Sequence, residues 1–288
     1  MPQLTRRIAL SGFALLLPTF QARAAGTASD DLGALEKSTG ARIGVTALDT
    51  GNGRTISYRE TERFIMCSSF KLSLAAAVLR RAEAGQEKLD RIIHYQKSDL
   101  LAVSPATTRN LSTGMTVEAL CEAAVVYSDN TAATLLIASI GGPQGVTNFW
   151  RSLGDRTSRL DRIEPALNVP DGDKDTTTPA AMLGDLNAML LGEALSPGSR
   201  QRLLGWLAAS TTGNAMLRAG LPKDWAVGDK TGRYVQELYN AAIDLAIATP
   251  PGRKPILIAA FTMNSRGDDA AQQAVLADIG KIVALRFA

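Results

Sequence analysis

The sequence predicts an α+β fold in which strands from both ends of the chain form one antiparallel sheet and a helical region is inserted between them. Strand-like segments lie at 42–58 and again at 225–263, whereas the intervening chain has helical patterns. Segregation of strands from helices is typical of α+β architectures. We therefore expect an α/β domain with flanking helices from residues 25–60 and 210–288, and a helical domain from residues 61–209.

The first strands form a predicted β-hairpin. Residues 42–48 alternate apolar and polar side chains, the pattern of a half-buried strand. Asn52-Gly53 is a strong hairpin turn signal, and residues 55–58 return as the second strand.

Helices and strands follow in separate blocks. Gly85 suits a helix end and Thr116 suits an N-cap. The expected helices are 69–84, 117–126, 131–140, 179–191, 199–209 and 268–287. The expected later strands are 225–231, 242–248 and 256–263, with a Pro-Pro-Gly turn before the last.

The N-terminus has the pattern of a secretory signal peptide. Arg6-Arg7 precedes an apolar run at 8–20, which is too short to span a bilayer, and Ala22-Arg23-Ala24 is a small-x-small cleavage pattern. We expect residues 1–24 to be removed. The paired arginines favour the twin-arginine route, although a basic segment also serves the general route. Both routes predict a periplasmic or secreted protein.

Composition excludes several classes of partner. The chain has 288 residues, 45% of them apolar and 20% charged, which is ordinary for a globular protein. Its formal charge of +3 falls to 0 once the three arginines of the signal peptide are removed, so nucleic acid is not an expected partner. A single His and two Cys, predicted to be buried free thiols, disfavour a zinc site. We expect no metal, no cofactor, no membrane contact after signal cleavage, and a monomer.

A serine and a lysine stand one helical turn apart in Ser68-Ser69-Phe70-Lys71. A serine hydroxyl is a weak nucleophile until a base accepts its proton. Lys71 lies on the same helix face as Ser68, and apolar neighbours would lower its pKa. By itself the pair is also compatible with a capping serine and a solvated lysine.

Two further motifs supply polar groups. Ser128-Asp129-Asn130 joins two predicted helices, where Ser128 could pass a proton and Asn130 could bind a carbonyl. Lys230-Thr231-Gly232 ends a predicted strand, where a lysine and a hydroxyl can hold a carboxylate. Gly232 would allow close approach of a ligand to the backbone.

An acidic residue lies in a long loop without periodicity, residues 159–175. Long irregular loops inside compact domains are usually functional. Glu164, with Asn168 one turn later, could hold and activate a water. Arg162 and Asp175 could pair across the loop and fix its shape.

Together these motifs resemble the class A serine β-lactamases, in the family's order and over nearly the whole mature chain. The resemblance implies the β-lactamase/penicillin-binding-protein-like fold and hydrolysis of the β-lactam amide of penicillins and cephalosporins, with antibiotic resistance as the result. It implies that Ser68 attacks the lactam carbonyl. Lys71, or Glu164 through a water, accepts its proton, and Ser128 relays the proton to the ring nitrogen. Glu164 with Asn168 then positions the hydrolytic water.

The resemblance also implies how substrate is held. Asn130 binds its side-chain amide, and Lys230 with Thr231 binds its carboxylate. The backbone N–H groups of Ser68 and Arg233 form the oxyanion hole. A further arginine often contacts the carboxylate in this family. Arg233 is a candidate for that role, because Gln273 stands where one such arginine is expected.

Three related functions remain open on the sequence. A D,D-peptidase of the cell wall shares the Ser-x-x-Lys, Ser-x-Asn and Lys-Thr-Gly motifs but lacks an efficient deacylating base, so Glu164 favours hydrolysis. A β-lactam sensor that only acylates would need a membrane tether, which the sequence does not show. A serine glutaminase of related fold would not need Glu164 in this setting.

Overall fold

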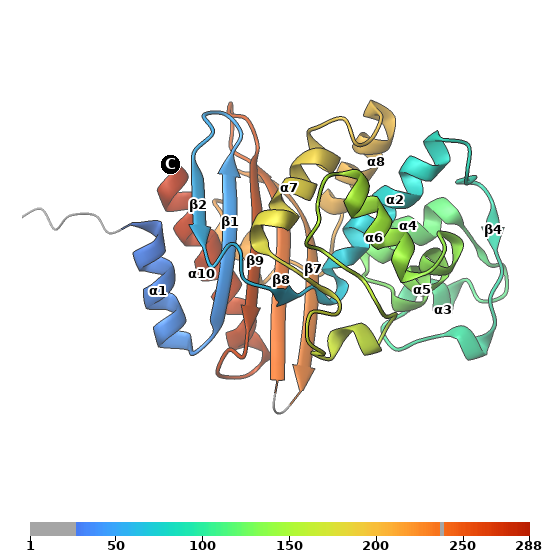
Figure 1. Cartoon of the computed structure of the whole chain (residues 1–288), viewed down its shortest axis with the longest axis horizontal. Helices are drawn as coiled ribbons and strands as arrows, with labels where there is room; N and C mark the ends of the chain where they lie inside the picture. Colours follow the sequence, from blue (N-terminus) through green and yellow to red (C-terminus); the bar gives the residue numbers. More distant parts are fainter. Residues whose placement is uncertain (1–26, 237–238) are drawn as a thin grey trace, which may run out of the picture.

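The computed structural model describes residues 27–236 and 239–288. A sheet with helices on both faces forms one part of the molecule, and a mainly helical part lies beside it (Figure 1). The predicted signal peptide, residues 1–24, lies outside the described residues.

The main sheet has five strands in the order β2-β1-β9-β8-β7, and every neighbouring pair is antiparallel. Its strands are β1 (Arg42–Asp49), β2 (Thr55–Tyr58), β7 (Ala226–Gln236), β8 (Tyr239–Thr249) and β9 (Ile256–Met263). The predicted sheet from both ends of the chain is therefore confirmed. Short two-residue strands pair elsewhere: β3 (Phe64–Ile65) with β6 (Thr176–Thr177), and β4 (Ile92–Ile93) with β5 (Met115–Thr116).

Most helices come from the middle of the sequence. The α-helices are α1 (Ala28–Thr39), α2 (Lys71–Glu83), α3 (Pro105–Arg109), α4 (Val117–Val126), α5 (Asn130–Ser139), α6 (Pro143–Ser152), α7 (Pro179–Leu190), α8 (Pro197–Ala208), α9 (Leu217–Gly220) and α10 (Asp269–Phe287). Three 3₁₀ turns are η1 (Cys67–Phe70), η2 (Lys97–Asp99) and η3 (Ala166–Asn168). Among the described residues, none of these helices has the length and apolar character needed to cross a bilayer.

Strand β9 is buried on both faces of the sheet. Ile256 and Ile258 belong to the apolar cluster that contains α1 and α10 residues, whereas Leu257 and Phe261 belong to the cluster beneath the helical part. Successive side chains of a strand point to opposite faces, so one apolar strand can serve two cores. Helices α1 and α10, from opposite ends of the chain, cover the same face (Figure 1).

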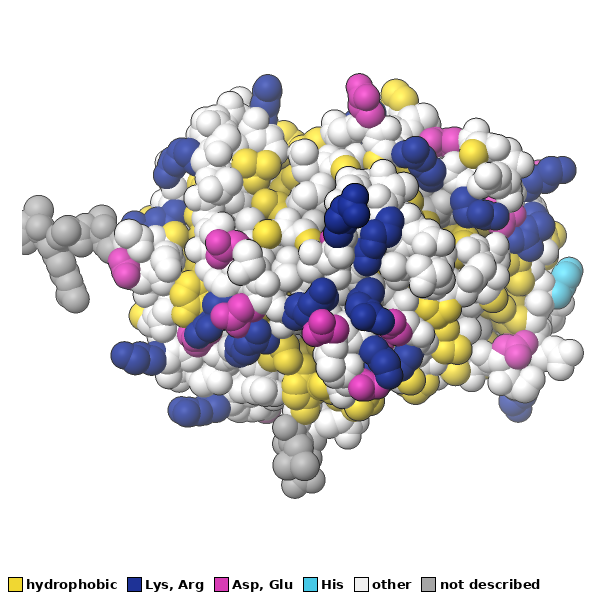
Figure 2. All heavy atoms as spheres, viewed as in Figure 1, with side chains coloured by type: hydrophobic (Ala, Val, Ile, Leu, Met, Phe, Trp, Pro, Cys, Tyr) yellow, Lys and Arg dark blue, Asp and Glu magenta, His cyan; other side chains and the backbone are white. Residues whose placement is uncertain are grey.

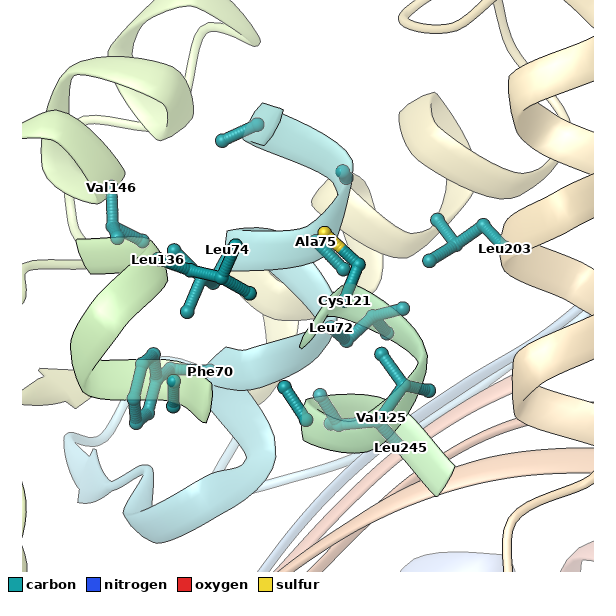
Figure 3. Packing of buried hydrophobic residues seen from close by; sticks show 14 of the residues in the cluster. Phe70, Leu72, Leu74, Ala75, Cys121, Val125, Leu136, Val146, Leu203 and Leu245 are labelled. Atoms are coloured by element: carbon teal, nitrogen blue, oxygen red, sulfur yellow. The ribbon is translucent and has the colours of Figure 1, made fainter. Parts of the chain in front are cut away.

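Helix α2 is the centre of the helical part. Its residues Leu72, Leu74 and Ala75 are fully buried. Figure 3 shows them packed among side chains of α4, α5, α6 and α8, with Leu245 of the sheet nearby. Full burial of a Leu side chain stabilises the fold by about 1.5–3 kcal/mol. The start of α2, which carries the predicted nucleophile, is therefore fixed by the core.

Several elements differ from the sequence prediction. Helices α1 and α6 and the short helices α3 and α9 were not predicted. Strand β8 begins at Tyr239 instead of at 242, and strand β7 continues to Gln236 instead of ending near Thr231. The strand continues because its last residues pair with the start of β8, where Tyr234 and Tyr239 place their ring centroids 6.1 Å apart. The Lys-Thr-Gly motif therefore lies within a long edge strand.

Candidate active site

A cavity of about 350 Å³ lies where the free edge of β7 meets the helical part. It gathers residues from all four sequence motifs. Its lining residues are Ser68, Val103, Tyr127, Ser128, Asn130, Glu164, Asn168, Thr212, Thr231 and Arg233. Lys71 and Lys230 lie beneath it with fully buried side chains.

Ser68 lies in η1, the tight turn that leads into α2. Cys67 before it has a φ of 44°, in the left-handed region that few non-glycine residues adopt. Buried Ser69 stabilises the turn by donating to the Met66 carbonyl over 2.7 Å. Ser68 itself is half-buried, and its hydroxyl donates to Glu164 Oε1 over 3.2 Å. The hydroxyl and the loop carboxylate are thus in direct contact.

Gly232 allows β7 to lie against this turn. A Cβ atom on Gly232 would lie 2.5 Å from the Met66 carbonyl oxygen and 2.9 Å from the Ser69 nitrogen. Both of those atoms belong to backbone, which cannot rotate away as a side chain does. The glycine therefore serves the packing of the edge strand against the turn that carries Ser68.

Lys71 is enclosed by acceptors. Its Nζ donates to the Ser128 carbonyl over 2.9 Å and to Asn130 Oδ1 over 2.5 Å, and it lies 3.3 Å from Glu164 Oε1. Burial lowers the pKa of Lys71, while the Glu164 carboxylate opposes that shift. A buried amine beside a serine and a carboxylate is suited to proton transfer.

The segment from Ser128 to Asn130 is fixed by Asp129. This buried carboxylate caps α5 by accepting from the Ala132 N–H over 2.9 Å, and it also accepts from Ala106 and Thr107 at the start of α3. Asn130 donates to the Ala102 carbonyl over 2.8 Å. One Asn130 N–H therefore remains for a ligand, because an amide NH₂ has two.

Lys230 lies on the other side of Ser128. Its Nζ donates to Ser128 Oγ over 3.1 Å and to the Thr231 carbonyl over 2.7 Å. Burial lowers the pKa of Lys230 to about 7, and the nearby charge of Lys71 acts in the same direction. Ser128 is thereby in contact with both lysines, through its carbonyl and its hydroxyl.

The predicted loop places its carboxylate and amide together. Asn168 Nδ2 donates to Glu164 Oε2 over 2.6 Å. The ion pair expected across the loop is confirmed, since Arg162 Nε lies 2.6 Å from the fully buried Asp175 Oδ2. Asp175 also accepts from the backbone N–H groups of residues 161 and 162, which ties the two ends of the loop together.

The sequence analysis did not predict two residues that line the cavity, Thr212 and Tyr127, or Asp269, which pairs with a lining residue. Thr212 forms a hydrogen bond of 2.6 Å with Thr231, and Tyr127 lines the cavity beside Ser128. Arg233 forms an ion pair with Asp269 at the start of α10. Thr212, Tyr127 and Asp269 belong to no motif, and only the fold brings them to the cavity. Both cysteines, as predicted, are buried and free among the described residues.

Comparison with known proteins places the chain in a family. The model of the β-lactamase enzyme family matches residues 27–287. Beta-lactamase AST-1 of Nocardia asteroides is 47% identical over 86% of this chain and 80% of its own length. The carbapenem-hydrolyzing beta-lactamase KPC of Klebsiella oxytoca is 48% identical over 86% of this chain and 85% of its own length. The solved ancestral class A beta-lactamase of Gram-negative bacteria is 52% identical, has a TM-score of 0.86, and aligns with 90% of this chain and 99% of its own. The α+β fold prediction is confirmed by this likeness, and the chain belongs to the class A serine β-lactamases.

Proposed function

We propose that this protein hydrolyses the β-lactam amide of penicillins and cephalosporins through an acyl-enzyme on Ser68, and that it thereby confers resistance to them. Support comes from the contact of Ser68 with Glu164 and from its buried lysine neighbour. In the first step a bond forms between Ser68 Oγ and the lactam carbonyl carbon, and the carbon–nitrogen bond breaks. In the second step water replaces Ser68 on that carbon.

Acylation needs a base for the Ser68 proton. Glu164 Oε1 lies 3.2 Å from the hydroxyl and 3.3 Å from Lys71 Nζ, so either group can take part. The proton then reaches the departing ring nitrogen through the Ser128 hydroxyl, which contacts Lys230, while Lys71 binds the carbonyl of the same residue. The backbone N–H groups of Ser68 and Arg233 hold the developing oxyanion, an effect commonly worth about 3–4 kcal/mol.

Substrate recognition uses the lysine on the Thr231 side of the cavity floor. Lys230 lies across Ser128 from the Lys71–Glu164 pair and contacts the Thr231 carbonyl, so its ammonium form attracts an anion to this end of the cavity. Lys230 and Thr231 bind the substrate carboxylate, with the Arg233 side chain assisting at the rim. Asn130 offers its free N–H to the substrate amide. Gly232 keeps the strand close to Ser68.

Deacylation is the step on which the proposal depends most. Once Ser68 Oγ is an ester oxygen it no longer donates to Glu164, which is then free to accept a proton from water. Asn168 Oδ1 is buried without a hydrogen-bond partner among the described residues, which suits an acceptor for that same water. The observation that supports the proposal most strongly is therefore the arrangement of Ser68, Glu164 and Asn168.

The predicted division of the chain is part of the proposal. The α/β domain consists of residues 25–60 and 210–288, and residues 61–209 form the helical domain with the 159–175 loop. We also propose that residues 1–24 direct export by the twin-arginine route, and that the mature protein acts as a periplasmic or secreted monomer.

The test combines turnover with trapping. The purified protein should hydrolyse nitrocefin, and a panel of penicillins, cephalosporins and carbapenems would define its range. Glu164→Ala should accumulate a covalent penicillin adduct that mass spectrometry assigns to Ser68, whereas Ser68→Ala should form none. A wild-type protein that itself stays acylated and does not turn over would instead indicate a D,D-peptidase or a sensor.

A further inference from the structure

A second hollow, of about 320 Å³, lies outside the cavity already described, between α6 and the segment that follows it. Arginines dominate its lining. The lining residues are Arg63, Gln144, Thr147, Arg151, Arg156, Thr157, Arg159, Leu160 and Asp161. Figure 2 shows Lys and Arg side chains gathered over the middle of the molecule, with fewer Asp and Glu side chains among them. We call this feature the arginine hollow.

Two of its guanidinium groups are held mainly by neutral acceptors. Arg151 Nη1 donates to the carbonyls of Asp155 and Ser158 over 2.7 and 2.8 Å. Arg63 Nη1 donates to the Thr157 carbonyl and to Thr176 Oγ1, both over 3.0 Å. Carbonyl and hydroxyl partners fix a guanidinium in place without cancelling its charge. These two arginines are therefore oriented before any ligand arrives.

Carboxylates neutralise the hollow only in part. Asp161 pairs with Arg159 over 2.6 Å, and the exposed Asp173 lies 3.3 Å from Arg63 Nε. Asp185, near Arg151, is buried, and burial together with Asp155 raises its pKa to about 9, so it is uncharged at neutral pH. Asp155 accepts from the N–H groups of Thr157 and Ser158, and because these donors are neutral, its charge also offsets part of the charge of the arginines.

Arg156 completes the cluster. It is exposed, and among the described residues it makes no hydrogen bond or ion pair, so all five of its N–H donors are available. An adjoining hollow of about 690 Å³ shares Arg63, Arg156 and Thr157 with the first. The space around Arg156 is thus larger than a single phosphate needs.

We propose that the arginine hollow binds a small multivalent oxyanion, one carrying two or three phosphate or carboxylate groups. A guanidinium fork matches two oxygens of either group, and bidentate pairing is the strong form of this contact. Two oriented guanidinium groups, Arg63 and Arg151, together with the exposed Arg156, favour a ligand with several anionic groups over a single ion. This site is independent of the hydrolysis at Ser68.

Binding is tested with pyrophosphate, citrate, orthophosphate and sulfate as probes. Titration calorimetry and thermal unfolding are measured at constant ionic strength set with NaCl. Pyrophosphate or citrate should bind and raise the unfolding temperature, and hydrogen exchange should slow over residues 151–161. Comparison of the two probes distinguishes phosphate from carboxylate as the preferred group. Equal responses to all anions and to NaCl would overturn the proposal.

The matched variants are Arg156→Gln and Lys254→Gln. Each removes one exposed positive charge, but Lys254 lies outside the lining of the hollow. Arg156→Gln should weaken binding about tenfold, the loss of one charge-assisted contact, and Arg156→Lys should restore part of it. Unchanged nitrocefin hydrolysis would show that the variant is folded. Equal binding by the Arg156→Gln and Lys254→Gln proteins would contradict the assignment.

Discussion

Asn168 donates its amide N–H to Glu164 Oε2 over 2.6 Å, while its own Oδ1 is buried and accepts no hydrogen bond among the described residues. A buried acceptor without a donor costs about 1–3 kcal/mol. A water molecule between this oxygen and the Glu164 carboxylate would remove that cost. The same water would be near the carbon atom that Ser68 carries after acylation.

Asn168→Ala should therefore slow deacylation more than acylation. We expect kcat to fall roughly ten- to a hundredfold, less than the 10²- to 10⁴-fold typical of removing a general base itself. A burst of product followed by a slow steady state should appear with penicillins in stopped-flow experiments. Loss of the acylation rate without any burst would contradict the assigned position of the water.

Gly232→Ala should disturb the strand that lies against Ser68. The new methyl group would stand 2.5 Å from the Met66 carbonyl oxygen, so β7 or the turn must move. Overpacking of this kind typically costs about 1–3 kcal/mol, and the acylation rate should fall as well. Denaturant unfolding and single-turnover kinetics measure the two effects. Gly53→Ala serves as a control for overpacking. A Cβ atom on this hairpin-turn glycine would meet no atom within 4 Å, although the φ of 76° would by itself strain an alanine there.

The elements that were predicted correctly carry local signals. Helix α4 begins and ends where predicted, because Thr116 caps it and its buried face is apolar. Helix α1 was missed because only Leu32 of its residues is buried, although the capping box of Thr27 with Asp30 was a usable signal. Helix α6 follows a Gly-Gly pair and starts with Pro143, which is also a start signal.

The site residues that could be predicted from the sequence are those that belong to recognisable motifs. Ser68 and Lys71 meet Glu164 in the structure because the fold brings two distant segments together. Thr212 and Asp269 could not be found, since a lone threonine in a loop and an acid at a helix start have no pattern that points to a cavity. Such partners depend on tertiary contacts alone.

Asp269→Asn should strengthen binding of anionic substrates. Asp269 pairs with Arg233 at the cavity rim, and both side chains are more than one third exposed, so the pair itself contributes about 0–1 kcal/mol to stability. Without the aspartate charge, the guanidinium is freer to contact the substrate carboxylate. KM for penicillins should fall a few-fold with kcat unchanged, the signature of uniform binding.

Two controls separate this effect from a general change at the rim. The gain should vanish in the Arg233→Gln/Asp269→Asn double variant, because the guanidinium is then absent. It should also vanish for a β-lactam whose carboxylate is esterified. An equal gain with the ester would show that Asp269 acts on something other than the carboxylate.

The lowered pKa of Lys230 predicts that the enzyme captures anionic substrates less well at alkaline pH. Burial and Lys71 lower the pKa of Lys230 to about 7, from an ordinary value of 10.5, so its ammonium form in the free enzyme is lost as pH rises through 7. The ammonium attracts the substrate carboxylate, and kcat/KM should therefore fall above about pH 7. Bound carboxylate stabilises the ammonium, so the corresponding fall in kcat should occur at higher pH.

Lys230→Arg keeps its charge across this range and should lose the alkaline fall in kcat/KM while retaining activity. Profiles of both proteins from pH 5 to 10 make the comparison, with an esterified substrate as the uncharged control. An identical alkaline fall in the Lys230→Arg protein would assign it to another group, of which Lys71 is the nearest candidate because burial lowers its pKa as well.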